Sequence, residues 1–279
     1  MQTINQTTSK DGTIIGYRQW GNGPGLILVH GGLMSSTGFE GLAKLLSESY
    51  TVYVPDRRGR GLSGQYGGNY NLSKECEDIQ ALVNKTGARY IFGLSSGALI
   101  ALQATLRVSG LQKTALYEPP LIVPGSNPID WTGRYERELA QGKLASAFLT
   151  IIKGTADSWS FMGLPRFILV PLVKLLLNAD AKKAAKEGEV TIKSLIPTLH
   201  YDFMLVAETE GKLGTFKNIQ TPVLLLGGGR SKSYLKKALD ALGNTLPHFQ
   251  RIEFPKAGHI VSVEKPEIVA KELKKFFVG

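Results

Sequence analysis

Short apolar runs alternate with longer amphipathic stretches along most of the 279-residue chain. The strand-like runs cover residues 25–30, 50–56, 90–94, 113–120, 221–228 and 248–255. Helical patterns occupy residues 39–49, 73–87, 97–110, 234–246 and 266–279. Continuous apolar strands that alternate with helices are typical of a parallel sheet covered by helices on both faces, so the pattern predicts an α/β fold.

Two segments depart from this rhythm. Residues 7–22 predict two leading antiparallel strands with a turn near Asp11 and Gly12. Residues 122–215 are rich in helical pattern and poor in β-branched runs, so we expect a helical insertion. The predicted organisation is a core of residues 1–121 and 216–279 with a helical cap of residues 122–215. The apolar faces of the cap need burial, either by packing on the core or by lining an apolar pocket as a lid.

Ser95 is the first candidate for chemistry. It stands in the G-x-S-x-G sequence of residues 93–97, directly between a predicted strand and a predicted helix. This is the setting of a nucleophile elbow, in which a sharp turn exposes the hydroxyl beside a helix N-terminus. The alternative is a serine that only caps a helix in a glycine-rich turn.

A serine nucleophile needs a base, and the chain has four histidines. His259 lies between the last predicted strand and the last predicted helix. Loops that follow parallel strands meet at one edge of a sheet, so His259 is expected near Ser95. His30 opens a glycine-containing loop after another strand, and we expect it to orient that loop. The backbone N–H groups of Gly32, or of its neighbour Leu33, and of Ser96 suit an oxyanion hole.

The chain resembles α/β-hydrolase fold enzymes. The matching pieces are HGGLMSS, PDRRGRGLSG, GLSSG, LYEPP and KAGH, in the order usual for that family. The resemblance covers nearly the whole chain and is weakest in the insertion. It implies an eight-stranded, mostly parallel sheet with helices on both faces and a helical cap inserted after the sixth strand.

The resemblance also implies roles for individual residues. Ser95 would be the nucleophile and His259 the base, with Gly32 and Ser96 as oxyanion donors. Asp56 matches a turn that is usually structural, and its expected role is to cap a loop.

The third member of the triad departs from the usual pattern. Many family members place an acid shortly after the strand that corresponds to residues 221–228, and here the next acid is Asp240, inside the following helix. A second location in the family, the end of the preceding strand, holds Glu118. We therefore predict the triad Ser95, Glu118 and His259. An acid from the insertion, such as Asp202, and a dyad without an acid remain open alternatives.

Composition adds few restrictions. The net charge is +10, but the lysines are scattered, so a solvated basic surface is expected and nucleic-acid binding is not. Cys76 is the one cysteine. No motif for a metal or a cofactor occurs, and none is expected. The polar start of the chain and the interrupted apolar stretch at 161–177 favour a cytoplasmic protein without stable membrane insertion.

The expected activity is serine hydrolysis of an ester-type small molecule with an apolar portion, through an acyl-enzyme. A serine at the elbow argues against haloalkane dehalogenase or epoxide hydrolase chemistry, which the resemblance ties to an aspartate. Two alternatives stay open. One is a C–C hydrolase, lyase or acyltransferase on the same scaffold, and the other is a ligand-binding protein without catalysis. The oligomeric state is not predicted.

Overall fold

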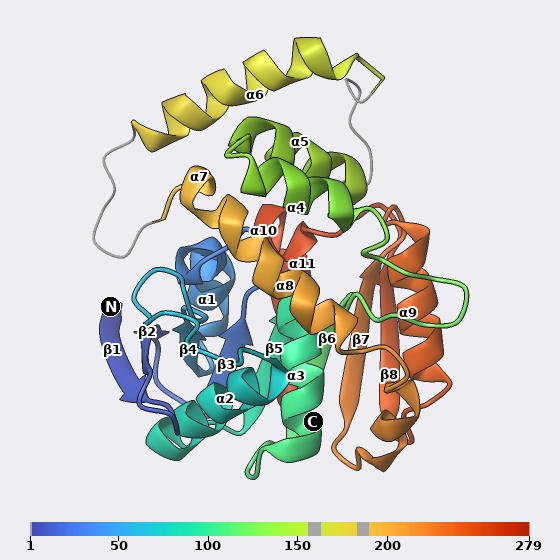
Figure 1. Ribbon diagram of the computed structural model, residues 1–279. Coiled ribbons are helices and arrows are strands. Elements are labelled where there is room, and N and C mark those ends of the chain that lie inside the picture. The colour runs from blue at the N-terminus through green and yellow to red at the C-terminus, as the bar shows by residue number, and fades with distance from the viewer. Residues whose placement is uncertain (1, 156–162, 183–189, 279) are drawn as a thin grey trace.

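The computed structural model describes residues 2–155, 163–182 and 190–278. A single eight-stranded sheet forms its centre, in the order β1-β2-β4-β3-β5-β6-β7-β8 (Figure 1). The strands are β1 Thr3–Thr8, β2 Ile14–Trp20, β3 Gly25–Val29, β4 Thr51–Pro55, β5 Tyr90–Leu94, β6 Lys113–Tyr117, β7 Val223–Gly228 and β8 Phe249–Phe254. The first two pair antiparallel, β2 is antiparallel to β4, and the remaining neighbours are parallel. The predicted mostly parallel sheet is confirmed.

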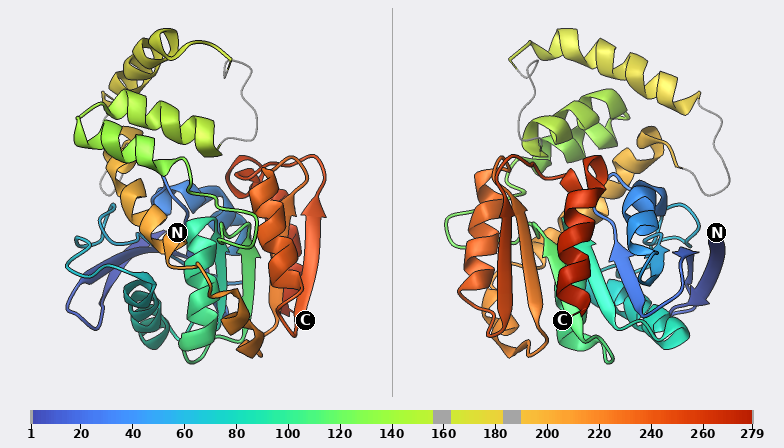
Figure 2. Two further views of the ribbon diagram at one scale, coloured as in Figure 1. Left: turned by 45° about the vertical axis from the view of Figure 1, so that its right-hand side comes forward. Right: turned by 180° about the vertical axis from the view of Figure 1, so that it is seen from behind.

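Helices cover both faces of this sheet (Figure 2). The helices outside the insertion are α1 Glu40–Leu46, α2 Leu72–Thr86, α3 Ser96–Arg107, α9 Ser233–Gly243, α10 Val261–Glu264 and α11 Pro266–Val278. Alternate residues of a strand point to opposite faces, so Ile27 joins the core under α2 and α3, whereas Leu26 and Leu28 join the core under α1 and α11. Burial on both faces explains why the central strands are continuously apolar.

A group of helices is inserted between β6 and β7. We call α4 Thr132–Ala140, α5 Leu144–Thr155, α6 Arg166–Ala181, α7 Ile192–Leu195 and α8 Leu199–Ala207 the inserted helices. Short 3₁₀ segments lie at Ser36–Phe39, Ile196–Thr198 and Leu213–Asn218. The inserted helices have a small apolar core of their own, which includes Tyr135, Ile151 and Leu199. Figure 1 shows them stacked above one end of the sheet, with α8 nearest to α3 and α6 outermost.

The apolar stretch 161–177 is only partly buried. Residues 161 and 162 lie outside the described residues, and α6 buries Leu169, Val173 and Leu177. Its other apolar side chains, among them Phe167 and Leu175, are exposed. We expected the apolar faces of the insertion to be buried. This holds for α5, but on α6 it holds only for the face that carries Leu169, Val173 and Leu177.

The strand that ends before Glu118 is shorter than predicted. We expected residues 113–120 to be extended, but β6 ends at Tyr117. Glu118 has a positive φ of 49°, and Pro119 and Pro120 follow, which lack the N–H groups that a strand needs. The early end turns the Glu118 side chain out of the strand register, to the edge of the sheet where β5 and β7 also end.

Candidate active site

Ser95 occupies a strained turn between β5 and α3. Its backbone angles are φ 56° and ψ −124°, a conformation that costs a non-glycine residue about 1–3 kcal/mol. The two flanking glycines make this turn possible by their lack of a side chain. A Cβ on Gly93 would lie 2.3 Å from the Gly97 carbonyl oxygen, and one on Gly97 would lie 2.2 Å from the Val29 carbonyl oxygen. The glycines of G-x-S-x-G are thus required by close packing of β5, α3 and β3.

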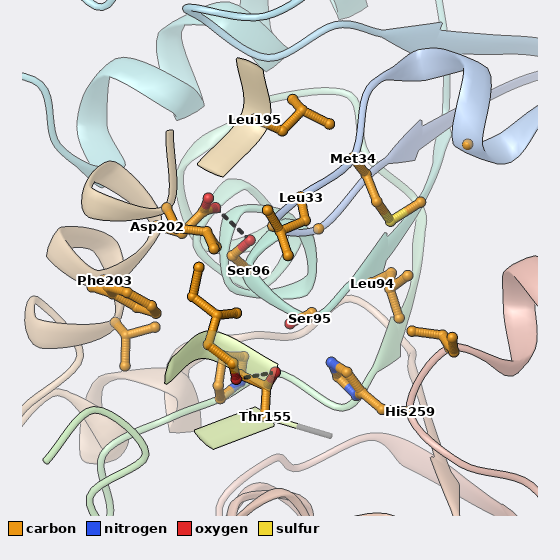
Figure 3. A pocket seen from close by; sticks show the side chains of 18 of the residues that line it. Leu33, Met34, Leu94, Ser95, Ser96, Thr155, Leu195, Asp202, Phe203 and His259 are labelled. Carbon is orange, nitrogen blue, oxygen red and sulfur yellow. Dashed lines mark hydrogen bonds between the residues drawn. The ribbon is translucent and has the colours of Figure 1, made fainter. Parts of the chain in front are cut away.

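His259 lies in the loop between β8 and α10, at the same edge of the sheet. Its Nδ1 is 2.6 Å from Oε2 of Glu118. The Tyr117 hydroxyl donates a hydrogen bond of 2.8 Å to the Gly258 carbonyl and so fixes the histidine loop to the end of β6. A carboxylate on Nδ1 favours the tautomer that carries its proton there, which makes Nε2 the ring nitrogen that can accept a proton. Ser95 and His259 both face the same cavity (Figure 3).

Glu118 is fully buried, and both of its carboxylate oxygens are bonded. Oε1 accepts a hydrogen bond of 2.6 Å from the Gly228 N–H, while Oε2 faces His259. Gly228 is the last residue of β7, just before the segment in which many family members carry the acid. A Cβ on Gly228 would lie 2.5 Å from the Ala257 carbonyl oxygen, so no side chain fits there. The end of β7 thus supplies a backbone donor to Glu118, which directly follows β6.

The two expected oxyanion donors, Gly32 and Ser96, line the same cavity as Ser95. Ser96 is the first residue of α3, and N–H groups in the first turn of a helix lack partners within the helix. Gly31 packs against the elbow, since a Cβ there would lie 3.1 Å from the Ser95 Cβ. Gly32 follows, and a Cβ on it would lie 2.6 Å from the Leu199 side chain of α8. The glycine loop therefore lies between the Ser95 turn and the inserted helix α8.

His30 is buried beneath this loop. Its Nε2 accepts the Arg57 N–H at 3.2 Å, and its Nδ1 donates to the Gly31 carbonyl at 3.0 Å. Burial, together with the charges of Arg60 and Arg57, lowers the pKa of His30 well below its usual value, so the ring is neutral at pH 7. These bonds match the loop-orienting role expected from the sequence. Asp56 caps its loop as expected, accepting from the backbone N–H groups of Ser36 and Leu62.

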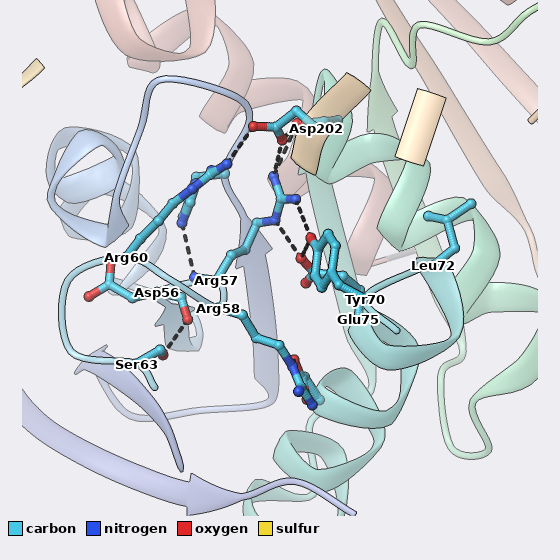
Figure 4. Close-up of polar contacts among 12 residues, drawn as sticks. Asp56, Arg57, Arg58, Arg60, Ser63, Tyr70, Leu72, Glu75 and Asp202 are labelled. Atoms are coloured by element: carbon cyan, nitrogen blue, oxygen red, sulfur yellow. Dashed lines mark hydrogen bonds and ion pairs between the residues drawn. The ribbon is translucent and has the colours of Figure 1, made fainter. Parts of the chain in front are cut away.

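Asp202, the alternative acid, belongs to a different cluster. It lies on α8, and its carboxylate is bound by Arg57 at 2.7 Å and by Arg60 (Figure 4). The Ser96 hydroxyl donates to it at 2.7 Å. Burial alone would raise the pKa of Asp202, but the charges of Arg60 and Arg57 outweigh it and lower the pKa to about 2. Glu118 and Asp202 were the two candidate acids for His259, and the histidine Nδ1 contacts Glu118.

The arginines of this cluster had not been singled out by the sequence reasoning. Three arginines, of which the first and the last bind Asp202, stand at positions 57, 58 and 60, directly after the apolar strand β4. Arg57 also contacts Glu75 and Tyr70 at 3.1 Å each, and all three side chains are buried. Three cations at the end of a buried strand were a signal for buried acidic partners, because such charges are rarely buried unpaired.

A cavity of about 590 Å³ lies between the sheet edge and the inserted helices. Ser95, Ser96, Gly32 and His259 line it on the core side. The remaining lining is mainly apolar and includes Leu33, Met34, Leu94, Pro120, Ile129, Trp131, Ile151, Leu195, Leu199, Phe203 and Val206. Asp202 is the one acidic side chain among the described lining residues, and Arg57 and Arg60 neutralise its charge. This cavity suits an uncharged, apolar group.

A second hollow of about 860 Å³ meets the first one at the histidine. Leu33, Ile151, Thr155, His259 and Ile260 border both. The cavity that Ser95 lines and this second hollow therefore adjoin at α5 and the histidine loop. Within the described part of the chain, no group of three His, Cys, Asp or Glu side chains could hold a metal ion. No helix in these residues has the length and apolarity to span a membrane.

Comparisons with known proteins agree with this geometry. A profile of the alpha/beta hydrolase family matches residues 26–272. The crystal structure of an alpha/beta hydrolase from Sphaerobacter thermophilus superposes with a TM-score of 0.77 at 29% identity, covering 98% of this chain and 100% of that one. The pimeloyl-[acyl-carrier protein] methyl ester esterase of Xanthomonas oryzae is 23% identical over 92% of this chain and 96% of its own length.

A third match is more local. An uncharacterised hydrolase of Bacillus subtilis is 37% identical over 112 residues, which are 38% of this chain and 41% of that protein. The family profile, by contrast, extends from β3 to α11 and includes every residue of the candidate site. With its elbow, its eight-stranded sheet and its inserted helices, the chain belongs to the alpha/beta hydrolase family.

Proposed function

We propose that the protein is a serine hydrolase that cleaves ester-type small molecules through an acyl-enzyme formed on Ser95. The observation that supports this most strongly is the relay of Glu118 and His259. A fully buried carboxylate, fixed by Gly228, holds the histidine Nδ1 at 2.6 Å, and the histidine and Ser95 border one cavity. Such an arrangement serves to hold a histidine as a general base.

The proposed reaction has two halves. His259 Nε2 takes the Ser95 proton as the hydroxyl oxygen attacks the ester carbonyl carbon. The carbonyl oxygen becomes an anion, which the Gly32 and Ser96 N–H groups stabilise. When the intermediate collapses, His259 gives the proton to the departing alcohol. Water, deprotonated by the same histidine, then releases the acid and restores Ser95.

The cavity suggests the substrate class. Its lining is mainly apolar and its one described acid is already neutralised, so we expect an uncharged, apolar acyl or alcohol group. Because residues 122–215 supply much of the lining through α5 and α8, we propose that this segment acts as a lid. The second hollow at His259 offers room for the other half of the ester. The leaving group must approach His259 to receive its proton.

The test is hydrolysis of a p-nitrophenyl ester series from acetate to decanoate. We expect turnover by the wild type, and loss of nearly all of it in Ser95→Ala and in His259→Ala. Triad variants commonly lose about 10⁴-fold or more in kcat. Activity on no ester of the series would contradict the proposal. Equal activity of Ser95→Ala and wild type would place the chemistry elsewhere.

A further inference from the structure

We propose that Asp202 is a positioning residue that ties the inserted helices to the oxyanion hole. The inference rests on the proposed hydrolase function and concerns how its donors are held. Asp202 is 3% exposed and lies in the first turn of α8, whereas its partners Arg57, Arg60 and Ser96 belong to the sheet-edge loops and α3. One carboxylate thus joins the insertion to both sides of the elbow.

The first link runs through Arg60 to the Gly31–Gly32 peptide. Arg60 donates to the Gly31 carbonyl oxygen at 3.0 Å, and His30 donates to the same oxygen. In a planar trans peptide the C=O and the following N–H point in opposite directions. Two donors hold the Gly31 oxygen on one side of the Gly31–Gly32 peptide. They therefore orient the Gly32 N–H towards the opposite side of that peptide. Asp202 holds the arginine that does this.

The second link runs through Ser96. Its hydroxyl donates to Asp202 at 2.7 Å and accepts from Arg57 at 3.1 Å. Both bonds fix the residue whose backbone N–H is the other oxyanion donor. The Asp202 carboxylate also lies close to Gly32 itself, since a Cβ there would be 3.5 Å from Oδ2. Figure 3 shows Asp202 bonded to Ser96 beside the cavity.

Charge alone does not explain a carboxylate at this place. A negative group near an oxyanion hole opposes the developing charge, and only its pairing with two arginines offsets that effect. Removal of the Asp202 charge would thus help catalysis if local potential were the main effect. The geometric account predicts the reverse, because Arg60 and Ser96 would lose the group that orients them. The sign of the change separates the two accounts.

The experiment compares wild type with Asp202→Asn, which keeps the shape and removes the charge. An alkyl trifluoromethyl ketone is the probe. Ser95 Oγ adds to its carbonyl carbon, the carbonyl electron pair moves to the oxygen, and the serine proton passes to His259. The adduct therefore carries the oxyanion. Ester kcat and KM are measured on the same preparations, and folding is monitored by thermal unfolding.

We expect Asp202→Asn to lower kcat by about 10- to 100-fold. Loss of an oxyanion donor itself lowers kcat by about 10²- to 10³-fold, so the effect of a residue that only positions the donors should not exceed it. The inhibition constant of the ketone should rise by a similar factor, with KM within about threefold of wild type. Ser96→Ala keeps the backbone N–H and loses the hydroxyl. It should weaken ketone binding, but by a smaller factor than Asp202→Asn does.

Asp78→Asn is the matched control. Asp78 is also a buried carboxylate, and it holds Arg58 of the same loop through bonds of 2.7 and 2.6 Å. Figure 4 shows Arg58 directed away from Asp202. This variant should lower the unfolding temperature and leave ketone affinity unchanged.

Wild-type or tighter ketone binding by Asp202→Asn would overturn the inference. If that variant does not fold, wild-type ketone binding by Ser96→Ala would overturn it equally. Failure of the proposed function would look different, because wild type itself would then neither turn over esters nor bind the ketone. In that case the inference falls with the function on which it rests.

Discussion

At the scale of single residues, two members of the proposed triad stand at strained backbone positions. Ser95 and Glu118 have φ angles of 56° and 49°, and each follows directly on a parallel strand. Such conformations persist only where the surroundings hold them. Here the surroundings are the glycines around the elbow and the Gly228 N–H on the carboxylate. The strained turn at Ser95 places that residue at the cavity, and the one at Glu118 places the carboxylate against His259.

Glu118→Gln should lower kcat on p-nitrophenyl esters by about a hundredfold or more, because an amide cannot stabilise the histidine once it gains a proton. The unfolding temperature should stay close to that of the wild type, since glutamine keeps the shape of the side chain. Glu253→Gln on β8, an exposed position, is the matched control. Wild-type turnover in Glu118→Gln would mean that the acid lies elsewhere or is not needed.

Gly97→Ala should destabilise the fold by several kcal/mol or prevent it, because the new Cβ would lie 2.2 Å from the Val29 carbonyl oxygen. Gly68→Ala provides the comparison, since nothing lies within 4 Å of its Cβ. Thermal unfolding of both variants is the measurement. Equal unfolding temperatures would contradict the packing that we describe around Ser95.

At the scale of elements, the sequence predicted the strands and helices of the sheet well, because each is a local pattern of apolar positions. Ends of strands were less predictable, as the early end of β6 at Glu118 shows. The link between Arg57 and Asp202 could not be predicted, because the two residues are 145 positions apart and their contact depends on how α8 docks. The same holds for Gly228, whose role is carried by a backbone N–H that every residue except proline has.

Helix α5 should control which acyl chains fit. Ile151 is buried and borders both hollows, so Ile151→Trp should shorten the available space. We expect the kcat/KM ratio of decanoate to acetate to fall by about tenfold. Leu175→Trp, on the exposed side of α6, should leave the ratio unchanged. An unaltered ratio in Ile151→Trp would show that the acyl chain does not pass α5.

At the scale of the whole molecule, two apolar cores sandwich the sheet, and one cluster of buried charges among the described residues lies where the sheet-edge loops meet the inserted helix α8. His30 lies in that region and is held neutral. In the unfolded chain a histidine gains a proton below about pH 6.5, whereas the folded chain resists this. The unfolded state therefore binds more protons at low pH, and stability falls as the pH falls.

We expect the free energy of unfolding to decrease below about pH 6.5 by up to 1.4 kcal/mol per pH unit from this one group. Above that pH the contribution is fully present. Urea unfolding at pH 5 to 7.5 measures the slope, which His30→Asn should flatten. His248→Asn, at an exposed position, should keep the wild-type slope. An identical slope in His30→Asn would contradict the neutral buried ring.

The most direct test of the central claim is to treat the wild type with a fluorophosphonate and locate the adduct by mass spectrometry of its peptides. Such a probe reacts with a serine that a base has activated. We predict one phosphonyl group per chain, on Ser95, and none in Ser95→Ala. Labelling should slow strongly in His259→Ala. A folded wild-type protein that takes no label at Ser95 would contradict the account and favour a ligand-binding role for the same cavity.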